Sequence, residues 1–141
     1  MLTERGWRFV LCSLLMQEIK AESTGDGFMT PEDTIKLCGR VPIAFVSSKY
    51  KGDIKANVAK AIEYGRIAFE KGFYPIVPHL YLPQILNDRD YKERRLAEKA
   101  CLEFVIFCEV FMCCGEMPPD SFMNEEYAQA VRCNRLIIRV D

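Results

Sequence analysis

The stretch from residue 43 to residue 77, IAFVSSKYKGDIKANVAKAIEYGRIAFEKGFYPIV, decides the fold. Its first five residues form an apolar run that ends in a small polar residue, which is typical of a buried parallel strand. A helix follows, with Asp53 as its N-cap and Gly72 as its stop. The second strand, residues 73–77, contains Pro75 and precedes Pro78, which places it near an edge of the sheet. The apolar residues that fall on one face of the helix are Ile54, Val58, Ala61, Ile62, Gly65 and Phe69.

The rest of the chain repeats this alternation of helix and strand. Asp88 or Asp90 opens a helix that is charged first and apolar later, and we interpret the apolar run 104–114 as the end of that helix followed by a strand at 110–114. A loop at 115–121, a helix at 123–133 and a strand at 136–140 complete the pattern. Alternating units of this length predict an α/β fold, in which helices cover both faces of a parallel sheet of four to five strands.

Residues 1–40 differ in character from the rest of the chain. Apolar residues recur at helical spacing from Trp7 to Ile19, which predicts an amphipathic helix. Thr30 followed by Pro31 predicts the start of a short second helix that ends near Gly39. We therefore expect an N-terminal helical extension, residues 1–40, joined to one α/β domain, residues 41–141. A total of 141 residues fits this single compact domain.

Charge and cysteine content argue against several classes of function. The 19 Lys and Arg residues against 20 Asp and Glu residues give a net charge of -1, without the basic surplus of nucleic-acid-binding proteins. Seven cysteines without a CxxC pair and a single histidine do not supply the usual zinc sets, so neither a metal nor another cofactor is predicted. An odd number of cysteines, mostly in apolar segments, indicates free thiols in a cytoplasmic protein. The apolar run 104–114 is too short to cross a bilayer, so no membrane partner is expected.

Polar side chains gather directly after the predicted strands. In open α/β sheets ligands bind beyond the carboxyl ends of the strands, where the strand order reverses. Three segments meet this condition, namely 47–53, 78–81, and 115–121 with the helix start that follows it. The candidate site residues that these segments carry are Ser47, Ser48, Tyr50, His79, Asp120, Glu125 and Glu126.

Four motifs follow one another in a fixed order. A strand leads into SSKYKGD at 47–53, Pro-His-Leu follows the second strand at 78–80, CEVFMCCG stands at 108–115, and an acidic loop precedes MNEEYAQAVRCNRLI at 123–137. This ordered set, over residues 43–141, resembles the nucleoside 2-deoxyribosyltransferase-like family, and in particular a branch of small bacterial and phage proteins. The resemblance implies a flavodoxin-like (Rossmann-like) sheet and cleavage of the N-glycosidic bond of a 2'-deoxynucleoside or nucleotide.

The resemblance also implies roles for particular residues. Glu126 stands at the position of the family's nucleophile, which attacks the anomeric carbon, and Asp120 at that of an acidic residue near the base or sugar. A carboxylate nucleophile with a second group that protonates or orients the leaving group is what glycosyl transfer with retention requires. Because Glu126 lies near a helix N-terminus, we expect it to stay ionised. The implied substrate-binding residues are Ser47, Ser48, Tyr50, Gly52 and His79.

Each candidate also has a structural interpretation. Glu125 and Glu126 are favourable in a first helical turn whatever the function, and we keep that interpretation for Glu125. Asp120 follows two prolines, where a turn residue or N-cap is common. His79 fits a polar residue satisfied at a strand end, but as the single histidine at the carboxyl end of a strand it is expected to line the pocket.

Two positions depart from the pattern of active transferases. Phe122 stands in the segment before the nucleophile helix, where the family has small residues, and its side chain would narrow or fill the sugar pocket. Cys101 stands where the family has an Asp. Two functions therefore stay open: N-glycosidic cleavage or deoxyribosyl transfer through Glu126, and binding of a nucleotide-like ligand without catalysis. A third is assembly through the N-terminal amphipathic helix. The expected partners are a small-molecule nucleoside or nucleotide and further copies of the chain, in a homodimer or higher homo-oligomer.

Overall fold

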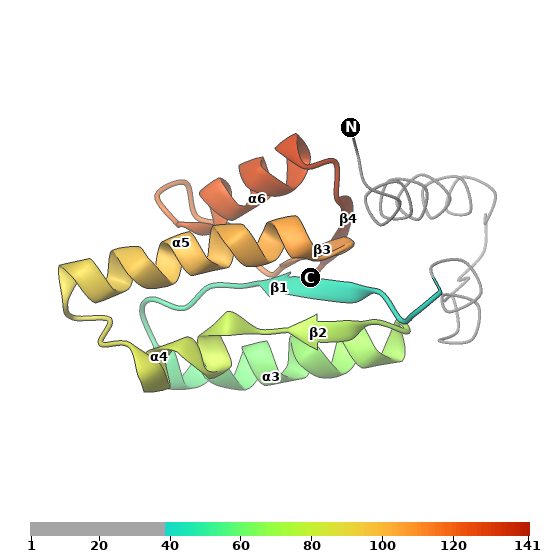
Figure 1. The fold of residues 1–141 in the computed structure, drawn as a ribbon. Helices are drawn as coiled ribbons and strands as arrows, with labels where there is room; N and C mark the ends of the chain where they lie inside the picture. Colours follow the sequence, from blue (N-terminus) through green and yellow to red (C-terminus); the bar gives the residue numbers. More distant parts are fainter. Residues whose placement is uncertain (1–38) are drawn as a thin grey trace.

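The computed structural model describes residues 39–141, which form one layered α/β domain (Figure 1). The N-terminal helices predicted within residues 1–38 lie outside the described residues. The helices and strands, in chain order, are β1 (Ile43–Ser47), α3 (Ile54–Glu70), β2 (Tyr74–Ile76), a 3-10 turn (Pro78–Leu80), α4 (Leu82–Ile85), α5 (Tyr91–Phe107), β3 (Val110–Cys114), α6 (Met123–Arg132) and β4 (Leu136–Val140).

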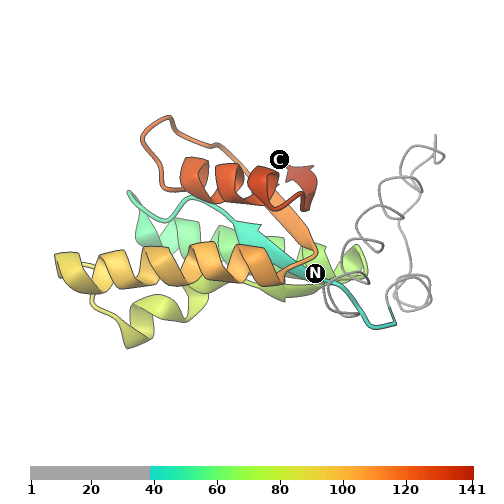
Figure 2. The ribbon, with the colours of Figure 1, turned by 45° about the horizontal axis from the view of Figure 1, so that its top comes forward.

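The four strands form one parallel sheet in the order β2-β1-β3-β4. Helix α3 covers one face, while α5 and α6 lie side by side on the other (Figures 1 and 2). The predicted flavodoxin-like α/β fold is confirmed, with the number of strands in the described part at the lower end of the expected range. The order reverses direction at β1 and β3, so the carboxyl ends of these two central strands mark the place where a ligand site is expected.

Two apolar clusters, one on each face of the sheet, hold the layers together. On the α3 face Val46 and Met112 pack against small residues of the helix, and on the other face Phe45 and Phe111 stack with their ring centroids 5.7 Å apart. Side chains of successive residues in β1 and β3 thus point to opposite faces, and both faces are buried. This explains why the sequence of both strands is continuously apolar.

The predicted capping residues fix the two long helices. The Asp53 carboxylate accepts the N–H of Ala56 at 3.1 Å, and the Asp90 carboxylate accepts those of Lys92 and Glu93. Asp90, rather than Asp88, is therefore the N-cap of α5. The strand predicted within the apolar run 104–114 is also confirmed, because α5 ends at Phe107 and β3 begins at Val110.

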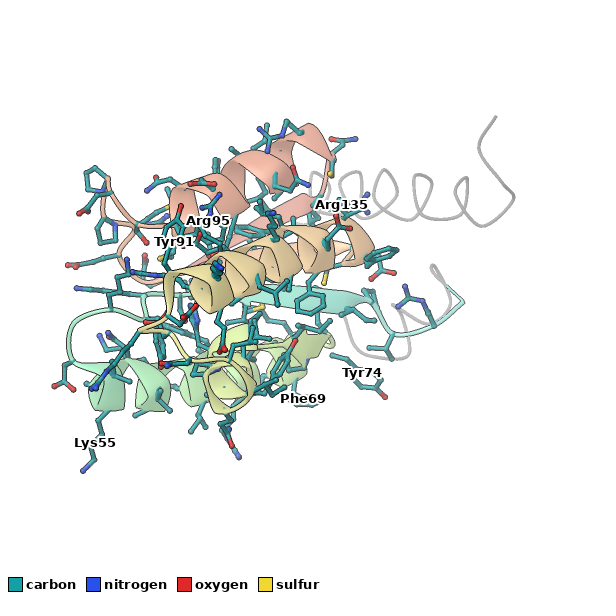
Figure 3. The ribbon with its side chains drawn as sticks, turned by 60° about the vertical axis from the view of Figure 1, so that its left-hand side comes forward. Lys55, Phe69, Tyr74, Tyr91, Arg95 and Arg135 are labelled. Carbon is teal, nitrogen blue, oxygen red and sulfur yellow. The ribbon has the colours of Figure 1, made fainter. Side chains whose placement is uncertain are left out.

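The face of α3 that packs on the sheet differs from the face formed by its large apolar residues. Ala61, Tyr64, Gly65 and Ala68 are buried, whereas Ile54, Ile62 and Phe69 are 49%, 51% and 59% exposed. Small residues allow the helix to approach the sheet closely, since a Cβ on Gly65 would already lie 3.5 Å from Val77 Cγ2. Phe69 packs instead against Tyr74 of β2, with ring centroids 6.0 Å apart, beside the edge of the sheet (Figure 3).

Strand β2 is shorter than the predicted strand 73–77 and lies at an edge, as its prolines indicate. Among residues 39–141 it pairs with β1 alone, so Pro75, which has no N–H to donate, costs this sheet no hydrogen bond on the other side of β2. After Ile76 the chain turns through the 3-10 turn and α4, a short helix that the sequence pattern did not reveal. This turn places His79 beyond the carboxyl end of β2.

Candidate functional site

A cavity of about 430 Å³ opens beyond the carboxyl ends of the central strands. All three segments predicted from the strand ends contribute to its wall: the loop after β1, the turn after β2, and the loop after β3 with the first turn of α6. Helices α4 and α5 close the remaining side. Of the predicted site residues, the structure brings together Ser48, Tyr50, Gly52, His79, Asp120 and Glu126 around this one cavity.

Glu126 is the buried acid of the site. It lies in the first turn of α6, is 2% exposed, and its Oε1 accepts a hydrogen bond of 2.9 Å from the Ser47 hydroxyl. No Lys or Arg of residues 39–141 forms an ion pair with it. Burial raises the pKa of Glu126 to about 8, although the hydrogen bond from Ser47 acts in the opposite direction. The expectation that Glu126 stays ionised is therefore wrong at neutral pH, because burial disfavours the charged form more than the hydrogen bond from Ser47 favours it.

The two serines at and directly after the end of β1 have different surroundings. Ser47 is 1% exposed and does not line the cavity, and its hydroxyl donates to Glu126. Ser48 does line the cavity, and its buried Oγ has no hydrogen-bond partner among the described residues. A buried hydroxyl without a partner at a cavity wall is a ready contact for a polar ligand atom.

His79 and Tyr50 form an aromatic wall of the cavity. Nε2 of His79 lies 2.8 Å from the carbonyl oxygen of Ser48, and the His79 ring stacks on Tyr50 with centroids 5.0 Å apart. Because a carbonyl only accepts hydrogen bonds, Nε2 of His79 carries the proton. Burial lowers the pKa of His79, which keeps the ring neutral at pH 7. The outer face of this neutral pair of stacked rings can accept a further planar group from a ligand.

The loop that carries Tyr50 is held by the first turn of α3. Nδ2 of Asn57 donates to the carbonyl oxygens of Tyr50 and Lys51, at 3.0 and 2.9 Å. Gly52 has φ +100, a conformation that other residues rarely adopt, so the loop requires glycine at this position. The loop is thus preorganised beside the cavity.

Asp120 lies in the loop between β3 and α6, exposed to solvent at the cavity rim. The side-chain amide of Asn124 donates to the carbonyls of Pro118 and Ser121, at 2.7 and 3.0 Å, and thereby fixes the loop on both sides of Asp120. Glu125, the neighbour of Glu126 in the sequence, is exposed and does not line the cavity. Its structural interpretation is therefore supported.

Phe122 lies at the cavity wall but does not fill the cavity. Its side chain packs against the apolar cluster around Phe45 and Phe111, and the space in front of Glu126 stays open. The expected obstruction is therefore absent from the described site. Cys101, which stands where an Asp was expected, also lines the cavity, and burial raises its pKa to about 12. Cys101 is thus a neutral thiol that cannot replace a carboxylate.

Sequence reasoning missed the side of the cavity formed by α4 and α5. Leu82 and Leu86 come from and follow the short helix α4, and Arg94, Ala97, Glu98 and Cys101 form a stripe along α5. Their spacing, i, i+3, i+4 and i+7, is the signal of a common helix face. A helix face that packs in a core is apolar, and one that faces solvent is polar, whereas this face carries both kinds of residue. That mixture is the sign in the sequence that the face borders a cavity.

Residues 39–141 contain no group of three or more His, Cys, Asp or Glu side chains arranged to hold a metal ion. Their cysteines are free, with Cys101, Cys108, Cys113 and Cys114 buried. No helix in this part of the chain has the length and apolar character needed to span a membrane. The cavity itself is lined by carboxyl, hydroxyl, aromatic and cationic side chains, together with apolar ones.

Comparison with known proteins identifies a family whose description assigns no function. A family model described as a domain of unknown function, DUF7768, matches residues 42–140, which is nearly all of the described domain. No curated protein matches the sequence.

Proposed function

The chain belongs to the DUF7768 family, and we propose that it cleaves the N-glycosidic bond of a nucleoside or nucleotide, by hydrolysis or deoxyribosyl transfer, with Glu126 as the nucleophile. One observation carries this proposal: a buried carboxyl group, held by Ser47, faces an open cavity that also contains Asp120 and an aromatic wall. Burial of a carboxyl without a paired cation is costly for stability, and such groups are concentrated at functional sites.

The reaction proceeds through a covalent intermediate. The Glu126 oxygen that is not bonded to Ser47 attacks the anomeric carbon, so a C–O bond forms as the C–N bond to the base breaks. The leaving nitrogen takes a proton from water, which the exposed carboxyl group of Asp120 at the cavity rim orients. Water, or the hydroxyl or ring nitrogen of an acceptor, then attacks the same carbon and gives up its proton to the solvent. The bond to Glu126 breaks as the new bond forms, so the carboxylate is released with overall retention.

The remaining residues bind and orient the substrate. The Tyr50 and His79 rings stack against a planar base, and the hydroxyl of Ser48 donates to or accepts from the sugar. Gly52 lets the loop after β1 approach the ligand. The ionised form of Glu126 is the attacking species, so the group must lose the proton that burial favours before reaction.

The test is base release from a panel of deoxynucleosides and deoxynucleotides, followed by liquid chromatography. We expect Glu126→Gln, which preserves shape and the acceptor for Ser47, to reduce base release on the order of 10³-fold or more. Glu125→Gln, the same change one residue earlier on an exposed side chain, is the matched control and should retain activity. Equal release by wild type and Glu126→Gln contradicts the proposal.

A second candidate function is binding of a nucleotide-like ligand without turnover. Two observations favour it: Glu126 is mainly protonated at neutral pH, and Cys101 is a neutral thiol where transferases have an Asp. Thermal unfolding with each panel member separates the two functions. Stabilisation of about 2.7 kcal/mol at a hundredfold excess over the dissociation constant, without base release, supports the binder.

We also propose that the protein works in the cytoplasm and assembles into a homodimer or higher homo-oligomer. The buried free thiols of residues 39–141 support a reducing compartment. Exposed apolar side chains such as Phe69, Tyr74 and Phe107, which are 59%, 57% and 64% exposed, support a contact with further chains. Size measurement by light scattering tests the assembly.

A further inference from the structure

We propose that Arg94 is a specificity-determining residue that binds the phosphate of a nucleoside monophosphate, so that the preferred ligand of the cavity is a nucleotide rather than a nucleoside. This inference rests on the proposed function, because it takes the sugar to lie at Glu126. The observation that carries it is an arginine at the cavity wall whose buried Nε has no hydrogen-bond partner among the described residues.

Arg94 has unused hydrogen-bonding capacity because its acidic neighbours are already engaged. Glu98, one turn further along α5, pairs with Arg95 through an N–O distance of 2.6 Å. Glu93 accepts the backbone N–H of Asn87. Within residues 39–141 the guanidinium of Arg94 takes part in no ion pair. Its planar set of donors is therefore available to a ligand, and that geometry suits the paired oxygens of a phosphate.

The position of Arg94 along α5 suits a ligand that extends from sugar to phosphate. Glu126 and Cys101 both line the cavity, and the charge of Glu126 contributes to the raised pKa of Cys101. Arg94 belongs to the same face of α5, two turns earlier, which corresponds to about 10 Å along the helix axis. Arg94 therefore contacts the cavity about two helical turns away from Cys101, the α5 residue whose pKa the charge of the nucleophile raises.

The other charges around the cavity make Arg94 decisive for an anion. Besides Glu126, the carboxylates at the wall are Asp88, Glu93, Glu98 and Asp120, against the cations Lys49, Lys51 and Arg94. The wall as a whole does not attract negative charge, so a phosphate requires direct contact with a donor such as Arg94. Removal of that donor is expected to abolish the preference of the site for nucleotides over nucleosides.

Lys99 supplies the control, since it is an exposed cation of the same helix that does not line the cavity and leaves the pair between Arg95 and Glu98 intact. Isothermal titration compares wild type, Arg94→Gln and Lys99→Gln with deoxynucleoside 5'-monophosphates, the corresponding deoxynucleosides and 2-deoxyribose 5-phosphate. We expect wild type to bind each nucleotide at least tenfold more tightly than its nucleoside. Arg94→Gln should lose this preference with nucleoside affinity unchanged, and Lys99→Gln should keep it. Arg94→Lys, which keeps the charge but not the paired donors, should retain only part of it.

Three results overturn the inference: wild type without a preference for nucleotides, Arg94→Gln with the wild-type preference, or equal loss of nucleoside and nucleotide binding in Arg94→Gln. The third result would mean that Arg94 contacts the base or supports the fold. The proposed function fails separately, since base release from uncharged deoxynucleosides by wild type supports it whatever Arg94 does. Circular dichroism of each variant identifies any loss of folding.

Discussion

Two buried glutamates lie at opposite ends of the sheet, and their surroundings differ. Glu109, before the first residue of β3, is 3% exposed, pairs with Arg40 and accepts the backbone N–H of Ile43 at 2.8 Å. Glu126, beyond the carboxyl ends of the strands, is equally buried, but within the described part of the chain its carboxyl group bonds only to the hydroxyl of Ser47. Glu109 thus serves the fold, because its charge is compensated, whereas Glu126 has a raised pKa and faces a cavity.

The difference teaches how to separate a structural acid from a functional one in the same domain. Burial is the same in both, so burial alone does not distinguish them. The partners do: a cation and a backbone N–H compensate a carboxylate, and a single hydroxyl does not. Replacement of each glutamate by glutamine should therefore change the free energy of unfolding in opposite directions.

The largest effect is expected from Glu126→Gln at alkaline pH. The pKa of Glu126 is raised from 4.5 to about 8, so between these values the folded protein keeps a proton that the unfolded chain releases. The free energy of unfolding of wild type therefore falls by about 1.4 kcal/mol per pH unit across this window from this group. Glu126→Gln removes that loss, so its advantage over wild type should grow from pH 5 to a few kcal/mol at pH 8.

Urea unfolding at pH 5, 6.5 and 8 measures this advantage. Glu125→Gln, on the exposed neighbour, should show no such growth. A constant difference between Glu126→Gln and wild type across the three pH values would mean that Glu126 is not a buried proton carrier.

Glu109→Gln should act in the opposite direction. The change removes the charge that pairs with Arg40 and weakens the bond to the Ile43 N–H. We expect a decrease of about 2 to 3 kcal/mol in the free energy of unfolding at pH 7, with faster hydrogen exchange at the Ile43 amide. Glu103→Gln, on the exposed side of α5, is the control. Stabilisation by Glu109→Gln would remove the distinction between the two acids.

The smallest effect is expected from Ser47→Ala, which should lower the free energy of unfolding by about 1 kcal/mol because one buried hydrogen bond is lost. Because the Ser47 hydroxyl lowers the pKa of Glu126, its removal should raise that pKa further. In wild type, kcat/KM should rise about tenfold per pH unit up to about pH 8 and then level off, and Ser47→Ala should move this rise to higher pH. Ser48→Ala, which removes no bond to Glu126, should leave the pH at which kcat/KM levels off unchanged while weakening substrate binding. If Ser47→Ala also leaves that pH unchanged, Ser47 does not control the pKa of Glu126.

Sequence patterns predicted where helices and strands begin and end better than they predicted which helix faces are buried. Local chemistry decides where Asp53 and Asp90 cap their helices and where β3 begins, so these features follow from short stretches of residues. The buried face of α3 does not, because the small residues Ala61 and Gly65 pack closest to the sheet while Ile62 faces solvent. The choice between large and small residues at that interface depends on the sheet, which the helix sequence does not contain.

The candidate site shows the same division. The strand-end rule correctly brought five predicted residues to one cavity, because topology alone carries them there, and the family resemblance added Gly52. It did not reveal that Ser47 contacts Glu126, that desolvation dominates the pKa of Glu126, or that Arg94 reaches the cavity from α5. Each of these depends on packing between elements that are distant in the sequence.

The single histidine of the chain, which stacks on Tyr50 at the cavity wall, can report directly whether a ligand occupies the cavity. With one imidazole in the whole chain, proton nuclear magnetic resonance of its carbon-bound ring protons yields one set of imidazole signals. His79 touches the Ser48 carbonyl and the Tyr50 ring, so a ligand that enters the cavity changes both its hydrogen bond and its ring-current environment. A titration can therefore be followed at His79 without a label, and without knowing in advance whether the ligand is consumed.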